Sequence, residues 1–84
     1  MIIFTKNKKY SFDDIADICN KNGLTTVDCL KNENMVSVEE YKNGELGDCI
    51  WEFKRIKDGL FKLSYIDKIY LKFFLDKKKM EYPQ

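Results

Sequence analysis

Histidine is absent from this 84-residue sequence, and proline and arginine each occur once. Without histidine, the side chain most often used for proton transfer near neutral pH is missing, and so is a common ligand of zinc. No glycine-rich phosphate loop, metal-ligand cluster or nucleophile with a neighbouring base is present instead. We therefore expect a protein that is not an enzyme and that needs no cofactor and no metal ion.

Cysteine is scarce, and no CxxC pair occurs. The three cysteines Cys19, Cys29 and Cys49 are an odd number and lie far apart in the sequence. A zinc site built from three thiolates would need a fourth ligand, for which the sequence offers no obvious source. We expect free, buried thiols that behave as small hydrophobic side chains.

Long apolar runs are also missing. No stretch reaches the roughly 18 apolar residues of a membrane span, and residues 1–4 are too short for the apolar part of a signal peptide. An apolar fraction of 44% argues against disorder, and folding of a chain this long buries roughly two-thirds of its extended surface. We expect one complete cytoplasmic domain over residues 1–84.

The stretch Cys49–Ile66 is typical of a β-hairpin that holds most of the core. A three-residue loop, Lys57–Gly59 with Gly59 in the left-handed conformation, gives the hairpin one apolar face. The expected cross-strand pairs are Trp51 with Tyr65, Phe53 with Leu63, and Arg55 with Phe61. Trp51 and Phe53 are then core residues. On the other face, Lys54 lies beside Lys62 and Glu52 beside Ser64, so these residues point outward.

The N-terminal helix has the clearest local signals. Ser11 caps it, Asp13 and Asp14 occupy its first turn, and Gly23 ends it. Its apolar residues recur at helical spacing and predict a buried face of Phe12, Ile15, Ala16 and Cys19. The remaining expected elements are a strand over Met1–Thr5, strands over Leu24–Lys31 and Met35–Lys42, and a loop over Asn43–Asp48.

Residues 64–79 fit either a strand or a helix. We favour a helix, because the basic run Lys77–Lys79 suits the negative end of a helix dipole. The expected core stripe is Ile66, Ile69, Tyr70, Phe73 and Phe74. Leu71 and Leu75 fall outside that stripe, which indicates deep burial, a homodimer contact or a partner surface.

Together these elements predict an α+β fold in the order β-α-β-β-β-β-α. It comprises an antiparallel sheet of four or more strands, an N-terminal helix packed on one face, and a C-terminal helix.

Charge is segregated along the chain. Residues 1–10 have a net charge of +3, residues 11–53 of −7 and residues 54–79 of +6, although the whole chain has only +1. Two interpretations stay open: the segregated charges form separate surfaces that steer charged partners, or they neutralise one another within the fold.

The first functional hypothesis is a small non-catalytic protein-binding module. Fourteen lysines against one arginine, together with abundant Ile, Asn, Phe and Tyr, indicate an AT-rich genome. Small proteins of this composition often come from phages or mobile elements and act as inhibitors of the anti-defence type, docking on a larger, nucleic-acid-handling protein. The acidic face expected to bind the partner comprises Asp13, Asp14, Asp17, Glu39 and Glu40.

The second hypothesis is nucleic-acid binding through the basic C-terminal third, where lysines would meet phosphates. The residues expected to bind are Lys54, Arg55, Lys62, Lys72, Lys77, Lys78 and Lys79. The order of helices and strands loosely resembles double-stranded RNA-binding domains, but the basic, alanine-rich second helix of that family is missing. The alternative is a solvated basic surface that binds nothing.

A third hypothesis comes from Glu52-Phe53-Lys54, with Asp48 just upstream. This Glu-x-Lys pattern on a strand resembles the catalytic strand of restriction-enzyme-like nucleases, which implies a Mg²⁺ site. The resemblance covers only these few residues, such a pattern often arises by chance, and the chain is short for that fold, so the alternative is a plain cross-strand or solvated charge pair.

Overall fold

A computed structural model describes residues 3–28, 34–42 and 45–81. Within these ranges, five strands form one antiparallel sheet in the spatial order β1-β5-β4-β3-β2, and two helices complete the fold. The elements are β1 (Lys9–Tyr10), α1 (Phe12–Asn22), β2 (Leu24–Asp28), β3 (Met35–Lys42), β4 (Glu45–Lys57), β5 (Leu60–Ile66) and α2 (Lys68–Glu81). The predicted α+β fold and its order of elements are confirmed.

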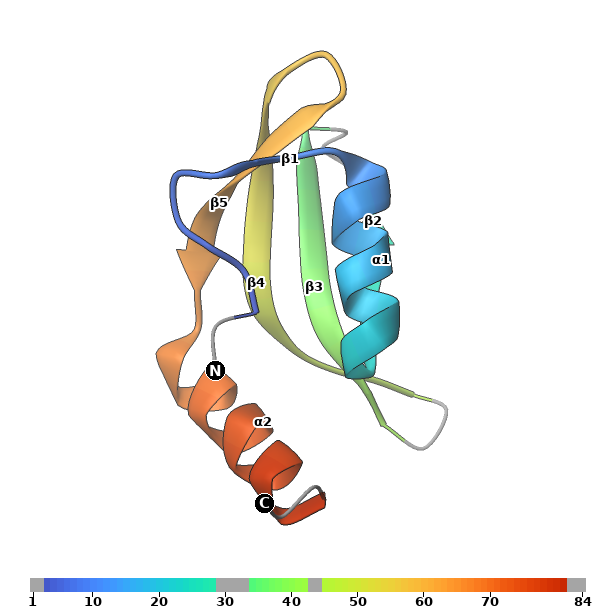
Figure 1. The fold of residues 1–84 in the computed structure, drawn as a ribbon, viewed down its shortest axis with the longest axis vertical. Coiled ribbons are helices and arrows are strands. Elements are labelled where there is room, and N and C mark those ends of the chain that lie inside the picture. Colours follow the sequence, from blue (N-terminus) through green and yellow to red (C-terminus); the bar gives the residue numbers. More distant parts are fainter. Residues whose placement is uncertain (1–2, 29–33, 43–44, 82–84) are drawn as a thin grey trace.

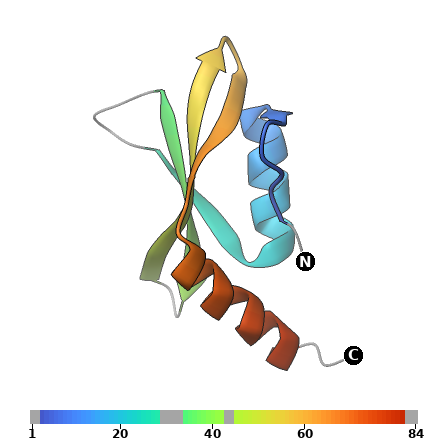
Figure 2. The same ribbon diagram turned by 90° about the vertical axis from the view of Figure 1, so that its left-hand side faces the viewer.

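The sheet has one covered face and one open face (Figures 1 and 2). Helix α1 and the N-terminal segment lie on the same side of the sheet, and α2 follows β5 at the end away from the β4–β5 turn. No helix within the described residues covers the opposite side, which we call the open face. None of the helices in the described part of the chain is long and apolar enough to cross a membrane.

Helix α1 begins and ends where its local signals predict. The Ser11 hydroxyl accepts a hydrogen bond from the Asp14 amide at 3.1 Å, and the Asp14 carboxylate accepts one from the Ser11 amide at 3.4 Å. Gly23 ends the helix with φ of 69°. Phe12 is 38% exposed, so its predicted burial is wrong. Helical side chains lean toward the N-terminus, which directs a first-turn residue beyond the packed part of the helix.

The β4–β5 hairpin has the predicted central register. Gly59 adopts φ of 74° in the turn, and the pairs Arg55 with Phe61 and Phe53 with Leu63 are confirmed. The strands pair closer to the turn than expected, because Lys57 pairs with Leu60 and the extra residue is accommodated by a register shift between Arg55 and Lys57.

A second register shift overturns two predicted pairs. Trp51 pairs with Ile66 and Glu52 pairs with Tyr65, so the predictions of Trp51 beside Tyr65 and Glu52 beside Ser64 are wrong. The Ser64 hydroxyl donates to the Glu52 carbonyl oxygen at 3.2 Å beside this bulge. The additional residue brings Tyr65 to the open face, where its side chain is 48% exposed.

The expected first strand is misplaced. Residues 3–5 form no strand, and the first strand is instead β1, which pairs with Phe61 and Lys62 of β5. Phe4 is buried among the core aromatic rings, and the Thr5 amide donates to the Tyr10 hydroxyl of β1 at 2.8 Å, so this segment contributes to the core without forming a strand. Residues 1–2 lie outside the described part of the chain.

Two other boundaries differ from expectation. The predicted strand Leu24–Lys31 is confirmed as far as Asp28, and its last three residues lie outside the described ranges. The predicted loop Asn43–Asp48 is wrong from residue 45 onward, because β4 starts there and pairs with β3. The close approach of these strands depends on Gly47, whose missing side chain leaves room for the Glu40 carbonyl.

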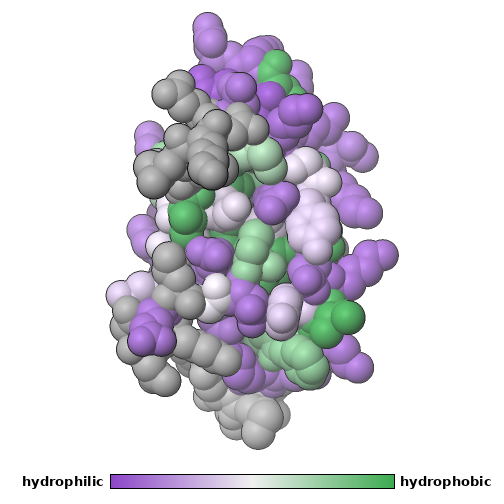
Figure 3. Space-filling model, turned by 180° about the vertical axis from the view of Figure 1, so that it is seen from behind, coloured by the Kyte–Doolittle hydropathy of each residue, from purple (hydrophilic) through white to green (hydrophobic). Residues whose placement is uncertain are grey.

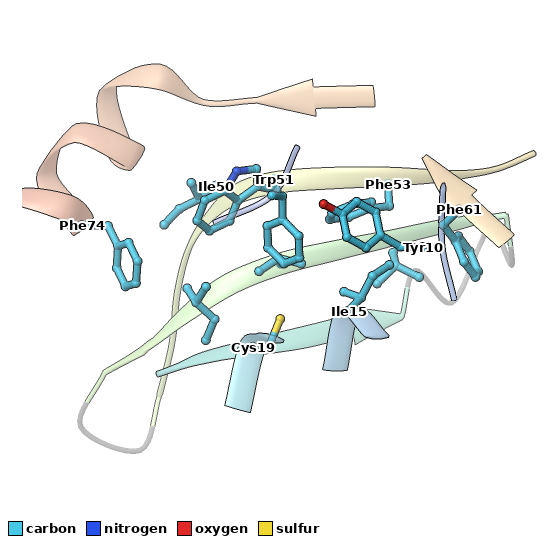
Figure 4. Packing of buried hydrophobic residues seen from close by; sticks show 12 residues of the cluster. Tyr10, Ile15, Cys19, Ile50, Trp51, Phe53, Phe61 and Phe74 are labelled. Atoms are coloured by element: carbon cyan, nitrogen blue, oxygen red, sulfur yellow. The ribbon is translucent and has the colours of Figure 1, made fainter. Parts of the chain in front are cut away.

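The core is an aromatic cluster centred on β4 (Figure 4). Trp51 and Phe53 are 1% and 0% exposed, which confirms them as core residues. The Phe4 ring lies edge-on to both, with centroid distances of 5.1 and 4.9 Å, and Phe74 lies 6.2 Å from Trp51. Ile15 and Cys19 point from α1 toward these rings. Every layer of the fold therefore contributes to one cluster.

Helix α2 is confirmed, but the predicted inner stripe is correct only for Ile66 and Phe74. Phe74 is buried, and Leu71 and Leu75 pack against the core. Ile69 and Phe73, which were expected inside, are 70% and 59% exposed. Both stripes have helical spacing, so the sequence pattern alone does not choose between them.

The start of α2 is anchored on β4. The Asp67 amide donates to the Ile50 carbonyl oxygen of β4 at 2.8 Å, and the Asp67 carboxylate accepts from the amides of Ile69 and Tyr70, both at 3.1 Å. Further along the helix, the packing of Phe74 against Trp51 holds the inner stripe on the sheet.

Candidate functional site

A cavity of about 300 Å³ opens between α2 and the β3–β4 hairpin. Its lining combines aromatic rings with charged side chains, and the lining residues are Glu40, Asp48, Ile50, Tyr70, Phe73, Asp76 and Lys77. We call this group the α2 cavity.

Three elements position the lining. Tyr70, Phe73 and Lys77 recur at helical spacing and so share one side of α2. Glu40 pairs with the buried Leu24, which places it on the covered face of the sheet. Asp48 alternates with Cys49 in β4, and Cys49 pairs with Glu39 on the open face. The α2 cavity therefore lies on the helical side of the sheet.

The electrostatics of the α2 cavity are acidic. The Lys77 ammonium pairs with the Glu40 carboxylate, and both side chains are partly exposed. Asp48 and Asp76 are exposed and form no ion pair with any described residue. Three carboxylates against one ammonium give the lining a net charge of −2.

This arrangement suits a cationic side chain. Aromatic faces attract ammonium and guanidinium groups, and carboxylates bind them through charge-assisted hydrogen bonds. Tyr70 and Phe73 are 40% and 59% exposed, and Ile69 next to them is 70% exposed. Figure 3 shows hydrophobic side chains gathered at one lower edge of an otherwise mostly hydrophilic rear surface. An exposed apolar group beside unpaired carboxylates is typical of a protein-docking surface.

No protein-family model, curated protein or solved structure matches this chain. The geometry of the site therefore provides the argument for its function.

The acidic residues predicted to bind a partner are divided among three places. Asp13, Asp14 and Asp17 lie on the exposed side of α1, and Asp17 pairs with Lys21 at 2.9 Å. Glu39 lies on the open face of the sheet, whereas Glu40 belongs to the α2 cavity. The structure does not bring these five carboxylates together on one surface.

The basic residues of the nucleic-acid hypothesis form two groups. Lys54 and Lys62 lie directly opposite each other on the open face, and the Arg55 guanidinium lies 5.3 Å from the centre of the Phe61 ring. The second group is on α2, where Lys72 is exposed, Lys77 pairs with Glu40, and the Lys78 ammonium lies 5.1 Å from the Phe74 ring centre. The side chain of Lys79 lies outside the described residues.

The nuclease pattern is not assembled in one place. Glu52 and Lys54 share the open face, as expected from alternation along a strand, but Asp48 lines the α2 cavity on the other side. Across the described ranges, no group of three or more His, Cys, Asp and Glu residues is placed to hold a metal ion.

Cys19 and Cys49 are free thiols. Burial raises the pKa of Cys19 to about 11. Burial also raises the pKa of Cys49, and the charges of Glu52 and Glu39 act in the same direction, while a hydrogen bond with Ser37 lowers it. Both thiols therefore stay protonated near neutral pH, which makes them poor nucleophiles. Cys29 lies outside the described residues.

Sequence reasoning did not bring Asp48, Tyr70, Phe73 and Asp76 together as the lining of one cavity. One signal pointed toward them: residues 66–75 contain more apolar side chains than one helix face can bury. Which of those side chains stay outside depends on the rotation of α2, and therefore on a contact with β4 that is distant in sequence.

Proposed function

We propose that this protein is a non-catalytic protein-binding module that docks through the α2 cavity and the exposed side of α2. The partner surface is basic and inserts a lysine or arginine side chain into the cavity. The observation behind the proposal is that exposed Tyr70 and Phe73 adjoin Asp48 and Asp76, two carboxylates that form no ion pair with any described residue, around one opening. Aromatic anchors next to charged groups are the usual centres of binding energy in protein interfaces.

The basic partner surface favours one class of partner. Surfaces that bind nucleic acid are rich in lysine and arginine, because they must neutralise phosphates. A small protein that docks on such a surface through an acidic cavity would block it. We therefore propose an inhibitor or accessory role toward a larger nucleic-acid-handling protein. Its origin in a phage or mobile element stays a prediction from composition.

The acidic side of α1 has a different role in this proposal. Asp13, Asp14 and Asp17 are exposed, but Asp17 already pairs with Lys21, and Phe12 is the only large exposed hydrophobic residue of that helix within the described chain. Exposed charges without apolar anchors mainly accelerate association and contribute little to affinity. We expect these residues to steer the partner toward the α2 cavity.

The test compares matched variants on the two acidic surfaces. A nuclease-treated lysate of the source cell is passed over the immobilised protein, the recovered protein is identified and purified, and its affinity is measured by calorimetry. The combined change Phe73→Ala with Asp76→Lys should weaken the complex at least about thirtyfold. The control, Asp13→Lys, Asp14→Lys and Asp17→Lys together, should slow association but retain the complex.

The opposite pattern would contradict the proposal. Loss of the complex in the α1 variant, with the α2 variant unaffected, would move the binding surface to α1. The same experiment is repeated with a lysate that has not been treated with nuclease. A partner protein recovered only from this untreated lysate would indicate nucleic-acid binding instead.

A homodimer is the competing occupant of the exposed side of α2. Sedimentation velocity over a wide concentration range measures it directly, and we expect a monomer. A dimer that dissociates on Ile69→Asp would assign this surface to a second copy of the chain.

A further inference from the structure

Three lysines form a row across the open face. The strand registers place Lys9 opposite Lys62 and Lys62 opposite Lys54, on β1, β5 and β4. Residues directly opposite in antiparallel strands share a face, and neighbouring strands lie about 4.8 Å apart. The three side chains therefore leave the sheet along a line about 10 Å long. We call them the lysine row.

The lysine row has no carboxylate partner in the part of the chain that the structure describes. The nearest acid on the same strand and face is Glu52, two residues from Lys54, and it forms no ion pair with a described residue. Like charges directly opposite in a sheet are destabilising. Repulsion among the three neighbouring lysines therefore destabilises the folded protein, and a bound anion would remove this repulsion.

Protection against strand pairing explains only part of the row. Lysines on edge strands prevent one sheet from adding to another, and Lys9 lies on the edge strand β1. Lys54 lies on β4, which has a strand on each side, so it needs no such protection. A binding site for a ligand with several negative charges in a line accounts for all three lysines of the row.

An aromatic ring accompanies the row. The bulge beside Ser64 brings Tyr65 to the open face, where it pairs with Glu52 and is 48% exposed. Exposed tyrosine rings on an uncovered sheet stack on unpaired nucleic-acid bases. No helix of the described residues covers the open face, and Figure 3 shows hydrophilic side chains around smaller hydrophobic groups there, so an extended ligand has access.

We propose that the lysine row binds successive phosphates of a single-stranded nucleic acid while Tyr65 stacks on one of its bases. A single strand is favoured over a duplex for two reasons. Stacking on Tyr65 requires an unpaired base, and Glu39 and Glu52 limit the basic part of this face to about the width of the row. The inference is independent of the proposed docking surface, because neither the lysine row nor Tyr65 lines the α2 cavity.

Fluorescence anisotropy with a labelled twelve-nucleotide oligothymidylate tests the proposal. Three phosphate contacts predict that log K falls against log salt with a slope of about −2. Replacing Lys9, Lys54 and Lys62 together by glutamine should abolish the binding. The matched control is Lys21→Gln, Lys68→Gln and Lys72→Gln, which removes the same charge from exposed positions elsewhere and should keep both affinity and slope.

The Tyr65 variants identify the ligand class. Tyr65→Ser should weaken oligothymidylate binding at least about fivefold, whereas Tyr65→Phe should retain it, because stacking needs the ring and not the hydroxyl. Duplex DNA and inorganic polyphosphate should both bind more weakly and show no effect of Tyr65→Ser.

Four results would overturn the proposal: no binding of the oligonucleotide, equal losses in the two triple variants, a Tyr65→Ser variant as tight as the wild type, or polyphosphate binding as tight as the oligonucleotide. Thermal unfolding checks that the variants fold. The row variant should melt at or above the wild-type temperature, since it relieves repulsion between like charges.

Discussion

Gly47 lies where β4 comes closest to β3. A Cβ atom at this position would stand 2.8 Å from the Glu40 carbonyl oxygen, which is closer than ordinary contact. The paired backbone there cannot yield without disturbing the bulged register between the strands. The same segment presents Glu40 and Asp48 to the α2 cavity, so this glycine positions the site as well as the sheet.

We expect Gly47→Ala to lower the free energy of unfolding by about 1–3 kcal/mol, the usual cost of forcing extra volume into a packed site. Urea denaturation measures it. The neighbouring exposed Asp48→Ala should stay within about 0.5 kcal/mol of the wild type. A Gly47→Ala protein as stable as the wild type would show that the strands separate there at little cost.

Cys19 makes stability depend on pH in the alkaline range. Its thiol has a pKa of about 11 in the fold because of burial, against 9.0 when unperturbed, so the unfolded chain releases this proton first. The stability that the protonated Cys19 thiol contributes to the fold is therefore fully present below pH 9 and is lost as pH rises toward 11. The urea concentration at the unfolding midpoint should drop more between pH 8 and pH 10.5 in the wild type than in Cys19→Ala. An equal drop of the midpoint in the two proteins would mean that the Cys19 thiol ionises as easily in the folded protein as in water.

The adjacent residues Phe73 and Phe74 separate the two roles of α2. Phe74 is 4% exposed and contacts Trp51, whereas Phe73 is 59% exposed and lines the α2 cavity. Phe74→Ala should therefore cost about 3–5 kcal/mol in unfolding free energy, while Phe73→Ala should change it by less than about 0.5 kcal/mol. Chemical denaturation followed by circular dichroism measures both. Similar losses in the two variants would mean that α2 does not dock in the described orientation.

Elements with local signals were predictable from the sequence. The capping box at Ser11 and the left-handed Gly23 fix the ends of α1, and Gly59 fixes the central register of the hairpin. The bulge beside Ser64 was not predictable, because it depends on where the chain must leave β5 to start α2. The rotation of α2 depends likewise on the packing of Phe74 against Trp51, residues 23 positions apart.

The candidate sites follow the same division. Alternation along β4 and β5 was enough to predict that Lys54 and Lys62 lie side by side facing outward. Lys9 was missed because its strand has only two residues, too few for a sequence pattern. The α2 cavity was missed because its lining comes from two strands and a helix that no local pattern relates to one another.

At the scale of the whole molecule, both interpretations of the segregated charge hold in different places. Lys77 of the basic third pairs with Glu40 of the acidic stretch, which is neutralisation inside the fold. On the open face, the lysine row stands at the end near the β4–β5 turn, while Glu39 and Glu52 lie further along the strands. That face therefore has a basic end and an acidic end.

The shared core predicts cooperative unfolding. Rings from the N-terminal segment, β1, β4 and α2 meet around Trp51 and Phe53. We expect the fluorescence of Trp51, the single tryptophan, and the far-ultraviolet circular dichroism to report one coincident transition in urea. A loss of helical signal ahead of the fluorescence change would show that α2 melts separately.

Trp51 is packed between Phe4, 47 residues before it, and Phe74, 23 residues after it. During synthesis on a ribosome, the β4–β5 hairpin is therefore made before the ring that completes the packing of the indole. Until α2 has emerged and packed, one side of Trp51 stays uncovered. The nascent hairpin is the stage at which a chaperone would find apolar surface to hold.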